Sequence, residues 1–310
     1  MPHLIKRKHI LLVDGENLLH QSFHRFENLK SSDGKPSGAI FGFFKSLHGY
    51  LDRFAPDKLV ITFDNGHSPY RTELWPHYKG HRLNISIDYE SLHKQKAVIM
   101  KILRYLRIIY IYDKYNYTKY EGDDFLAYLA LKVYGDPKKY KVTLVSTDKD
   151  FNQLIDKHLK VYHQIKDQMV RLENCKELVG YTPDECSQWL SIIGDASDDI
   201  PGYKGLGPVG TRKFLDHFGS IDNYLNSKED WPKVDKELMA KTWERNKQLI
   251  DLKWFINHVP LKLTDLPMKL SKKPINWNKF KSIALDYTLN SFLSNMFITT
   301  YKEQYERSTK

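Results

Sequence analysis

Apolar residues occur along this chain in two recurrent patterns. Short continuous runs, typical of buried strands, lie at 9–13, 59–63, 108–112 and 142–145. Between these runs, apolar residues recur every three or four positions, which is typical of helices; the stretches are 38–54, 94–108 and 121–133. This alternation predicts an α/β fold with a central, mostly parallel sheet and helices on both of its faces.

The pattern changes near residue 180. Two short runs at 159–162 and 169–172 predict a small additional strand pair, and the sequence from Thr182 onward is mostly of helical periodicity. We therefore expect an α/β domain over residues 1–180 and a helical region over 181–310. The tail, 301–310, is polar and is expected to be frayed.

Acidic residues follow three of the predicted strands. Asp14, Asp64 and Asp148 come at or just after strand ends, and the carboxyl ends of parallel strands share one edge of a sheet, where ligands bind. The acidic motifs are Val13-Asp14-Gly15, Phe63-Asp64-Asn65, Glu121-Gly122-Asp123-Asp124, Thr147-Asp148-Lys149-Asp150 and Gly194-Asp195-Ala196-Ser197-Asp198. Two carboxylates about 4 Å apart repel by roughly 4 kcal/mol at an effective dielectric constant of about 20. A cluster of this kind favours bound divalent cations, which prefer oxygen ligands.

Each motif alone has an ordinary structural explanation. Acidic residues in a first helical turn, such as Glu121 and Asp124, complement the helix dipole. The Asp148–Asp150 pair and the Asp195–Asp198 pair are compatible with turn chemistry. The conjunction of all five motifs in one chain favours the metal-binding interpretation.

Composition and charge narrow the class of protein. The chain has 310 residues, 41% of them hydrophobic, which is enough for a packed core. No apolar stretch approaches the roughly 18 residues of a membrane span, and no secretory leader is apparent, so we expect a cytoplasmic protein. The two cysteines, Cys175 and Cys186, are expected to be free thiols.

The net charge of +10 predicts a polyanionic partner. An acidic cluster on a strongly basic body is the charge distribution of an enzyme that acts on nucleic acid. A basic surface retained for solubility is the alternative.

The glycines Gly205, Gly207 and Gly210 match the G-x-G-x-x-G string of dinucleotide-binding proteins. That interpretation requires a preceding strand, whereas a turn precedes them here. A hairpin between two helices fits better, because backbone N–H groups at the start of a helix over 208–218 bind phosphate without reading a base. Lys204, Arg212 and Lys213 would strengthen this grip.

The segment 70–82 interleaves aromatic and basic residues. This mixture suits single-stranded nucleic acid, through stacking and backbone charge. A solvated surface loop is the alternative.

Taken together and in this order, the motifs resemble those of the flap endonuclease family. That family comprises the 5′-nuclease domains of bacterial DNA polymerase I and their free-standing phage and bacterial relatives. The resemblance covers about residues 9–218. The residues that carry it are the acidic motifs above, Gly38-Ala39-Ile40-Phe41-Gly42-Phe43, Tyr70-Arg71, Tyr78-Lys79-Gly80-His81-Arg82 and 194–207.

The resemblance implies a role for each matching residue. A first metal site would contain Asp14, Asp64, Glu121, Asp123 and Asp124, and a second Asp148, Asp150, Asp195 and Asp198. Arg71, Lys79 and Arg82 would be catalytic residues at the start of a helical arch over about 68–107, with Lys79 and Arg82 facing the scissile phosphate. A helix–hairpin–helix element over about 187–218, with Gly202, Gly205 and Gly207, would grip duplex DNA, often with K⁺.

The implied activity is that of a monomeric, stand-alone, two-metal 5′ nuclease that uses Mg²⁺, or Mn²⁺ as a substitute. It would act on 5′ flaps and duplex 5′ ends of DNA, and on RNA primers, leaving 5′-phosphate and 3′-hydroxyl products in a bacterial cell or a phage-infected host. Two alternatives stay open: an inactive protein that binds branched DNA, and a related RNA-directed nuclease. Asp199, Gly122 and Glu16 depart from the usual family residues and bear on metal affinity.

Overall fold

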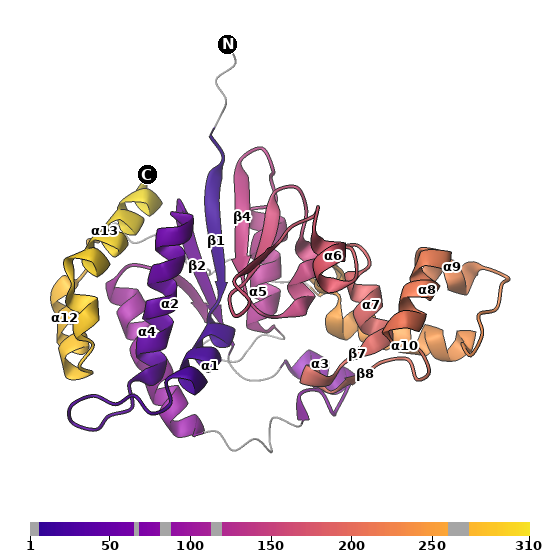
Figure 1. Cartoon of the computed structure of the whole chain (residues 1–310), viewed down its shortest axis with the longest axis horizontal. Coiled ribbons are helices and arrows are strands. Elements are labelled where there is room, and N and C mark those ends of the chain that lie inside the picture. Colours follow the sequence, from indigo (N-terminus) through magenta and orange to yellow (C-terminus); the bar gives the residue numbers. More distant parts are fainter. Residues whose placement is uncertain (1–5, 65–67, 81–87, 113–119, 260–272) are drawn as a thin grey trace, which may run out of the picture.

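The computed structural model describes residues 6–64, 68–80, 88–112, 120–259 and 273–310. A six-stranded sheet in the order β3-β2-β1-β4-β5-β6 forms its centre (Figure 1). The first five strands in this order run parallel to one another, and β6 runs antiparallel to β5. The strands are β1 (Lys8–Asp14), β2 (Lys58–Phe63), β3 (Ile109–Tyr112), β4 (Tyr140–Val145), β5 (Leu159–His163) and β6 (Gln168–Val170); β7 (Gly194–Asp195) and β8 (Ile200–Pro201) form a separate hairpin.

Helices cover both faces of the sheet, as the sequence pattern predicts. The α-helices are α1 (Gly15–Arg25), α2 (Gly38–Phe54), α3 (Pro69–Leu74), α4 (Tyr89–Tyr105), α5 (Gly122–Tyr128), α6 (Cys175–Val179), α7 (Cys186–Ile193), α8 (Pro208–Phe218), α9 (Ile221–Asn226), α10 (Lys236–Ile250), α11 (Leu252–His258), α12 (Trp277–Asp286) and α13 (Asn295–Thr309). A π-helical turn, η2 (Leu129–Val133), continues α5, and the short 3₁₀ helices are η3 (Lys149–Leu154), η4 (Ala196–Asp198) and η5 (Asn290–Leu293).

Alternating residues of the central strand point to two separate cores. Leu11 and Val13 of β1 pack with residues of α1, α2 and α4, whereas Ile10 and Leu12 pack with residues of α5 and α11. A strand buried on both faces must be apolar throughout, which explains the continuous run read from the sequence. The α/β prediction is confirmed.

The strand order reverses between β1 and β4, so the two halves of the sheet diverge at this point. In open parallel sheets, ligands bind outside the carboxyl ends of the strands at such a reversal. Asp14 ends β1, and Asp148 follows β4 by three residues, so both lie at this position.

The last two helices fold back onto the sheet domain. Phe280 of α12 and Phe297 and Tyr301 of α13 belong to the same core as Phe44 of α2. Figure 1 shows α12 and α13 beside α2 and α4, far from α8 and α9. The segment 181–310 is therefore helical but is not one spatial unit.

The prediction of a frayed tail is wrong. Helix α13 continues to Thr309, and Tyr301 and Gln304 are buried. Lys302, Glu303 and Glu306 of the tail lie on the solvent side of a helix whose other face packs against the core, a distinction that composition alone does not make.

Both cysteines, Cys175 and Cys186, are buried free thiols, as predicted. Among the described residues, none of the helices combines the length and the apolar character that a membrane span requires.

Candidate active site at the carboxyl edge of the sheet

Asp14 is held at the junction between β1 and α1. It caps α1, since its Oδ1 accepts a hydrogen bond of 2.9 Å from the backbone N–H of Asn17. Its Oδ2 accepts a hydrogen bond of 2.8 Å from the hydroxyl of Ser146, at the end of β4. The same hydroxyl accepts the backbone N–H of Asp148 at 3.0 Å. Ser146, which the sequence did not single out, therefore joins Asp14 to the Asp148 motif.

Asp64 approaches the start of α5 very closely. Its Oδ1 accepts a hydrogen bond from the backbone N–H of Gly122. A Cβ atom at position 122 would lie 2.8 Å from this oxygen, closer than such contacts normally come. Gly122, which has no Cβ, thus permits this contact between Asp64 and the start of α5.

Asp148 and Asp150 are placed by the short helix η3. Asp148 caps it, with Oδ1 accepting the backbone N–H of Asp150 at 2.8 Å. Oδ1 of Asp150 is buried and has no hydrogen-bond partner among the residues that the structure describes. A buried carboxylate oxygen without a donor is destabilised unless a cation compensates it.

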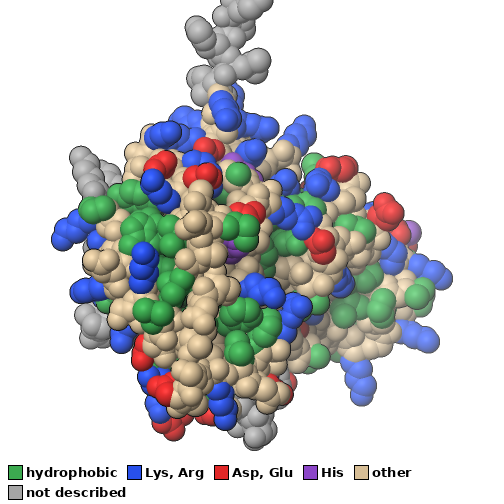
Figure 2. Space-filling view, turned by 60° about the vertical axis from the view of Figure 1, so that its left-hand side comes forward, with side chains coloured by type: hydrophobic (Ala, Val, Ile, Leu, Met, Phe, Trp, Pro, Cys, Tyr) green, Lys and Arg blue, Asp and Glu red, His purple; other side chains and the backbone are tan. Residues whose placement is uncertain are grey.

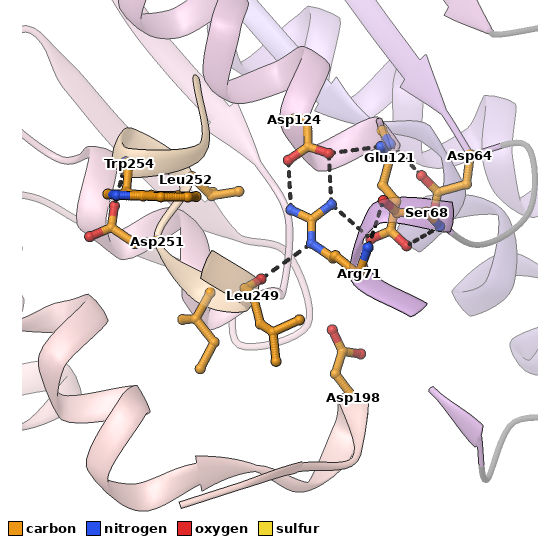
Figure 3. A network of polar contacts seen from close by, with 12 residues as sticks. Asp64, Ser68, Arg71, Glu121, Asp124, Asp198, Leu249, Asp251, Leu252 and Trp254 are labelled. Atoms are coloured by element: carbon orange, nitrogen blue, oxygen red, sulfur yellow. Dashed lines mark hydrogen bonds and ion pairs between the residues drawn. The ribbon is translucent and has the colours of Figure 1, made fainter. Parts of the chain in front are cut away.

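Asp195 and Asp198 come from the β7–β8 hairpin. Asp195 Oδ1 accepts the backbone N–H of Ser197 at 2.9 Å and lies 3.1 Å from the Lys149 ammonium. The Asp198 carboxylate points from the hairpin toward the other acidic residues (Figure 3). It lies 3.8 Å from Lys79 Nζ and 3.3 Å from the Tyr78 hydroxyl oxygen.

Burial and mutual repulsion raise the pKa of most of these carboxyls. Burial first, and then the neighbouring carboxylates, raise the pKa of Asp14 to about 7 and the pKa values of Asp64 and Asp148 to about 6. The same causes raise the pKa values of Asp123 and Asp150 well above the usual range. These five side chains form a group in which burial and mutual repulsion outweigh the opposing effect of Lys79 and Lys149.

Asp124, in contrast, is neutralised by Arg71. The guanidinium donates hydrogen bonds of 2.8 and 2.7 Å to the two carboxylate oxygens, and both side chains are buried (Figure 3). Arg71 also donates to the carbonyl of Leu249 at 3.2 Å and lies 4.5 Å from the ring centre of Phe255. The pair thus joins α3, α5 and the α10–α11 junction. The metal-binding role of Asp124 and the catalytic role of Arg71 stay predictions.

Glu121 is neutralised by Lys79. Its Oε2 lies 2.9 Å from the Lys79 ammonium and accepts a second hydrogen bond of 2.9 Å from the Tyr78 hydroxyl. Although burial alone raises the pKa of Glu121, Lys79 and Arg71 bring it down to about 2. Lys79 is itself buried, and its backbone adopts a φ of 55°, which is uncommon outside glycine.

A second lysine, half-buried, supports the same edge. Lys96 of α4 donates hydrogen bonds of 2.6 Å to Glu16 Oε2 and 2.7 Å to the carbonyl of Asp64. This accounts for the unusual Glu16, which pairs with a lysine 80 positions away. The sequence placed Lys96 in a helix but contained no sign of this pairing.

The donor set fits hard divalent cations. It consists of carboxylates whose charge Lys79 and Lys149 compensate only in part, and it includes Oδ1 of Asp150, which has no hydrogen-bond partner among the described residues. Within the described part of the chain, no three carboxylate, His or Cys side chains already surround one point closely enough to hold an ion.

The segment predicted to bind duplex DNA consists of α7, the β7–β8 hairpin and α8, which together form a helix–hairpin–helix element. Helix α8 has the predicted bounds. Gly202 passes so close to α7 that a Cβ atom would lie 2.3 Å from the Ile192 carbonyl. Gly205 has a φ of 107°, which favours glycine. Gly207 caps α8, and Gly210 lies in its first turn.

The basic residues of the helix–hairpin–helix element differ in how available they are to bind phosphate. Lys204 and Lys213 are exposed. Arg212 binds both oxygens of Glu185, at 3.0 and 2.6 Å, and also lies 2.8 Å from Asp216. The positive charge of Arg212 is therefore largely neutralised by carboxylates of the protein itself. Arg82, the remaining predicted residue, lies outside the described residues.

Comparisons with known proteins agree with this geometry. The family model of the 5′-3′ exonuclease N-terminal, resolvase-like domain matches residues 9–180. The 5′-3′ exonuclease of Aquifex aeolicus is 28% identical over 89% of this chain and 94% of that protein. The thermostable DNA polymerase I of Thermus aquaticus is 29% identical over 87% of this chain and 30% of that protein. The solved structure of the bacteriophage T5 D15 flap endonuclease with DNA and metal ions shares the fold, with a TM-score of 0.65, 18% identity, and coverage of 98% of this chain and 100% of that one.

Proposed function

The chain belongs to the 5′-3′ exonuclease family and is a 5′ nuclease, and on that premise we propose that it removes 5′ ends and 5′ flaps from DNA with two Mg²⁺ ions. The observation that carries the proposal is the group of five carboxyls with raised pKa, one buried and four half-buried, at the reversal point of the sheet. It lies beside the buried cation of Lys79 and next to a helix–hairpin–helix.

The described residues suggest how the two ions would be shared. Asp14, Asp64 and Asp123 would hold one ion, and Asp148, Asp150, Asp195 and Asp198 the other. Bound divalent ions of this kind activate water and neutralise charge on a phosphodiester. We propose Mg²⁺ as the physiological ion, with Mn²⁺ as a substitute, because the donor set consists only of oxygen.

The protein's own groups would hold and orient the DNA. Backbone N–H groups at the start of α8, with Lys204 and Lys213, would bind the duplex phosphates without reading the base sequence. The Lys79 ammonium lies 2.9 Å from Glu121 and 3.8 Å from Asp198, where it would offset charge on the reacting phosphate. Recognition would therefore depend on the shape of the DNA. A K⁺ ion at the hairpin and a monomeric state remain proposals.

The direct test uses a duplex with an end-labelled 5′ flap. We expect cleavage near the junction with Mg²⁺ and none with chelator. Tight binding without cleavage in either Mg²⁺ or Mn²⁺ would instead support the branched-DNA-binding alternative. The same substrate with an RNA flap distinguishes the remaining alternative, since exclusive cleavage of RNA would contradict a DNA nuclease.

A further inference from the structure

The β7–β8 hairpin, which carries Asp195 and Asp198, has little structure of its own. Each of its strands has two residues, and Asp199 adopts a φ of 54°. A left-handed conformation at a residue other than glycine persists only where the surroundings hold it. The position of Asp198 therefore depends on what contacts the hairpin from outside.

On one side, the segment after α3 donates to two successive carbonyls of the hairpin. The backbone N–H of Lys79 donates to the Asp198 carbonyl at 3.0 Å. The indole Nε1 of Trp75 donates to the Asp199 carbonyl at 2.8 Å. Together these bonds fix the peptide groups on the carboxyl side of Asp198.

On the other side, α10 holds the next part of the hairpin. Arg245 Nη2 and Asn246 Nδ2 each donate a hydrogen bond of 2.9 Å to the Pro201 carbonyl. Asn246 is fully buried and also donates to the Ser191 carbonyl at 2.9 Å. The hairpin is therefore anchored to both α7 and α10.

Arg245 connects the two sides. Its guanidinium lies 4.8 Å from the ring centre of Trp75, a distance typical of a cation–π contact. Trp75 is thus held by Arg245 while it holds Asp199. This contact to the hairpin backbone comes from an uncharged side chain of the segment that carries Lys79.

We propose that Trp75 is a positioning residue, which fixes Asp198 for cation binding through the Asp199 carbonyl. The inference rests on the proposed function, because it concerns how Asp198 meets a divalent ion. It also means that the hydrogen bond from Trp75 to the Asp199 carbonyl fixes the relative positions of the segment that carries Lys79 and the hairpin that carries Asp198. Displacing one loosens the other.

The test is Trp75→Phe, which removes the indole N–H and keeps an aromatic ring. The matched control is Trp243→Phe, because the buried Trp243 also donates its indole N–H, at 3.0 Å to Asp222, but within the core of α8, α9 and α10. Mn²⁺ binding to the DNA-free proteins is measured by electron paramagnetic resonance, and cleavage is measured as a function of Mn²⁺ concentration.

For Trp75→Phe we expect Mn²⁺ binding to weaken by about tenfold, as is usual when a group that orients a metal ligand is lost. The cleavage rate should return to the wild-type plateau at high Mn²⁺, with an unchanged KM for DNA. Trp243→Phe should bind Mn²⁺ like the wild type. Arg245→Met, which removes the cation beside the ring, should weaken Mn²⁺ binding in the same direction.

Wild-type Mn²⁺ binding by both Trp75→Phe and Arg245→Met would overturn the inference, as would a lower cleavage plateau that excess Mn²⁺ does not restore. Both results leave the nuclease proposal standing. Absence of Mn²⁺ binding by the wild-type protein would contradict the proposed function, and this inference with it.

Discussion

The ammonium of Lys79 lies 2.9 Å from Oε2 of Glu121, inside the carboxylate cluster. Lys79, which the family resemblance predicts to face the scissile phosphate, is a buried counter-ion in the DNA-free protein. A positive charge at this position competes with divalent cations for the same carboxylates.

Replacing Lys79 by Met should therefore have two opposite effects. Mn²⁺ affinity of the DNA-free protein should rise, because a competing charge is lost. Cleavage should fall by about 10²–10³-fold, because the charge that offsets the phosphate is missing. Lys94→Met, which removes an exposed lysine paired with Glu90, should change neither quantity. Weaker Mn²⁺ binding by Lys79→Met would contradict this account.

Arg71→Met should destabilise the fold strongly. It leaves the fully buried Asp124 without its partner, and breaking a buried ion pair in this way costs about 3–5 kcal/mol. Arg53→Met removes an arginine whose pair with Asp167 is exposed, and should cost about 1 kcal/mol or less. Urea unfolding of both variants measures the difference, and equal losses would show that the Arg71 pair has no special structural role.

The raised pKa values predict how stability depends on pH. In the metal-free protein, protonation of Asp14, Asp64 and Asp148 favours the fold. This contribution is complete below their ordinary pKa of 3.8 and is lost as the pH rises toward 7. Glu121, with a pKa of about 2, contributes in the opposite sense: its stabilisation is present above pH 4.5 and is lost as the pH falls toward 2.

Added Mg²⁺ should reverse the loss near neutral pH, because the ion binds the ionised carboxylates. The increase in Tm on adding Mg²⁺ should be small at pH 5 and large at pH 8. Thermal unfolding with Mg²⁺ and with chelator across this range checks the prediction. An increase in Tm that is independent of pH would place the ions elsewhere.

Much of the architecture can be predicted from the sequence, because the spacing of apolar residues differs between strands and helices. The strands at 9–13 and 59–63, and the helices at 38–54 and 208–218, lie where the pattern places them. The return of α12 and α13 to the sheet domain is not visible, because a helix that packs on a distant core has the same periodicity as one that packs nearby.

The acidic residues of the candidate site could be predicted from the sequence, but the basic residues that pair with them could not. Asp14, Asp64 and Asp148 follow strands, so their convergence is predicted by topology. The pairing of Arg71 with Asp124 and of Lys96 with Glu16 spans 53 and 80 positions and has no local sequence pattern. The contact between Trp75 and the hairpin depends on the fold in the same way.

DNA binding should be strongly sensitive to salt, because the proposed grip is on phosphates. The basic side chains are spread widely over the face shown in Figure 2, in keeping with the net charge of +10. The double variant Lys204→Ala/Lys213→Ala should reduce the magnitude of the slope of log K against log salt by about 2. Arg212→Ala should change this slope less, since Arg212 is already paired with Glu185. An unchanged slope in the double variant would show that the duplex phosphates are not bound at the start of α8.

The most direct test of the account is Asp148→Asn, assayed for both cleavage and binding of the 5′-flap duplex in Mg²⁺. The substitution keeps the shape of a residue at the reversal point of the sheet but removes its charge. Asp184→Asn, at a carboxylate whose side chain is 96% exposed, is the control. The account predicts near-complete loss of cleavage with nearly unchanged flap affinity for Asp148→Asn, and wild-type behaviour for Asp184→Asn. Full cleavage by Asp148→Asn would contradict the assignment of this edge of the sheet as the active site.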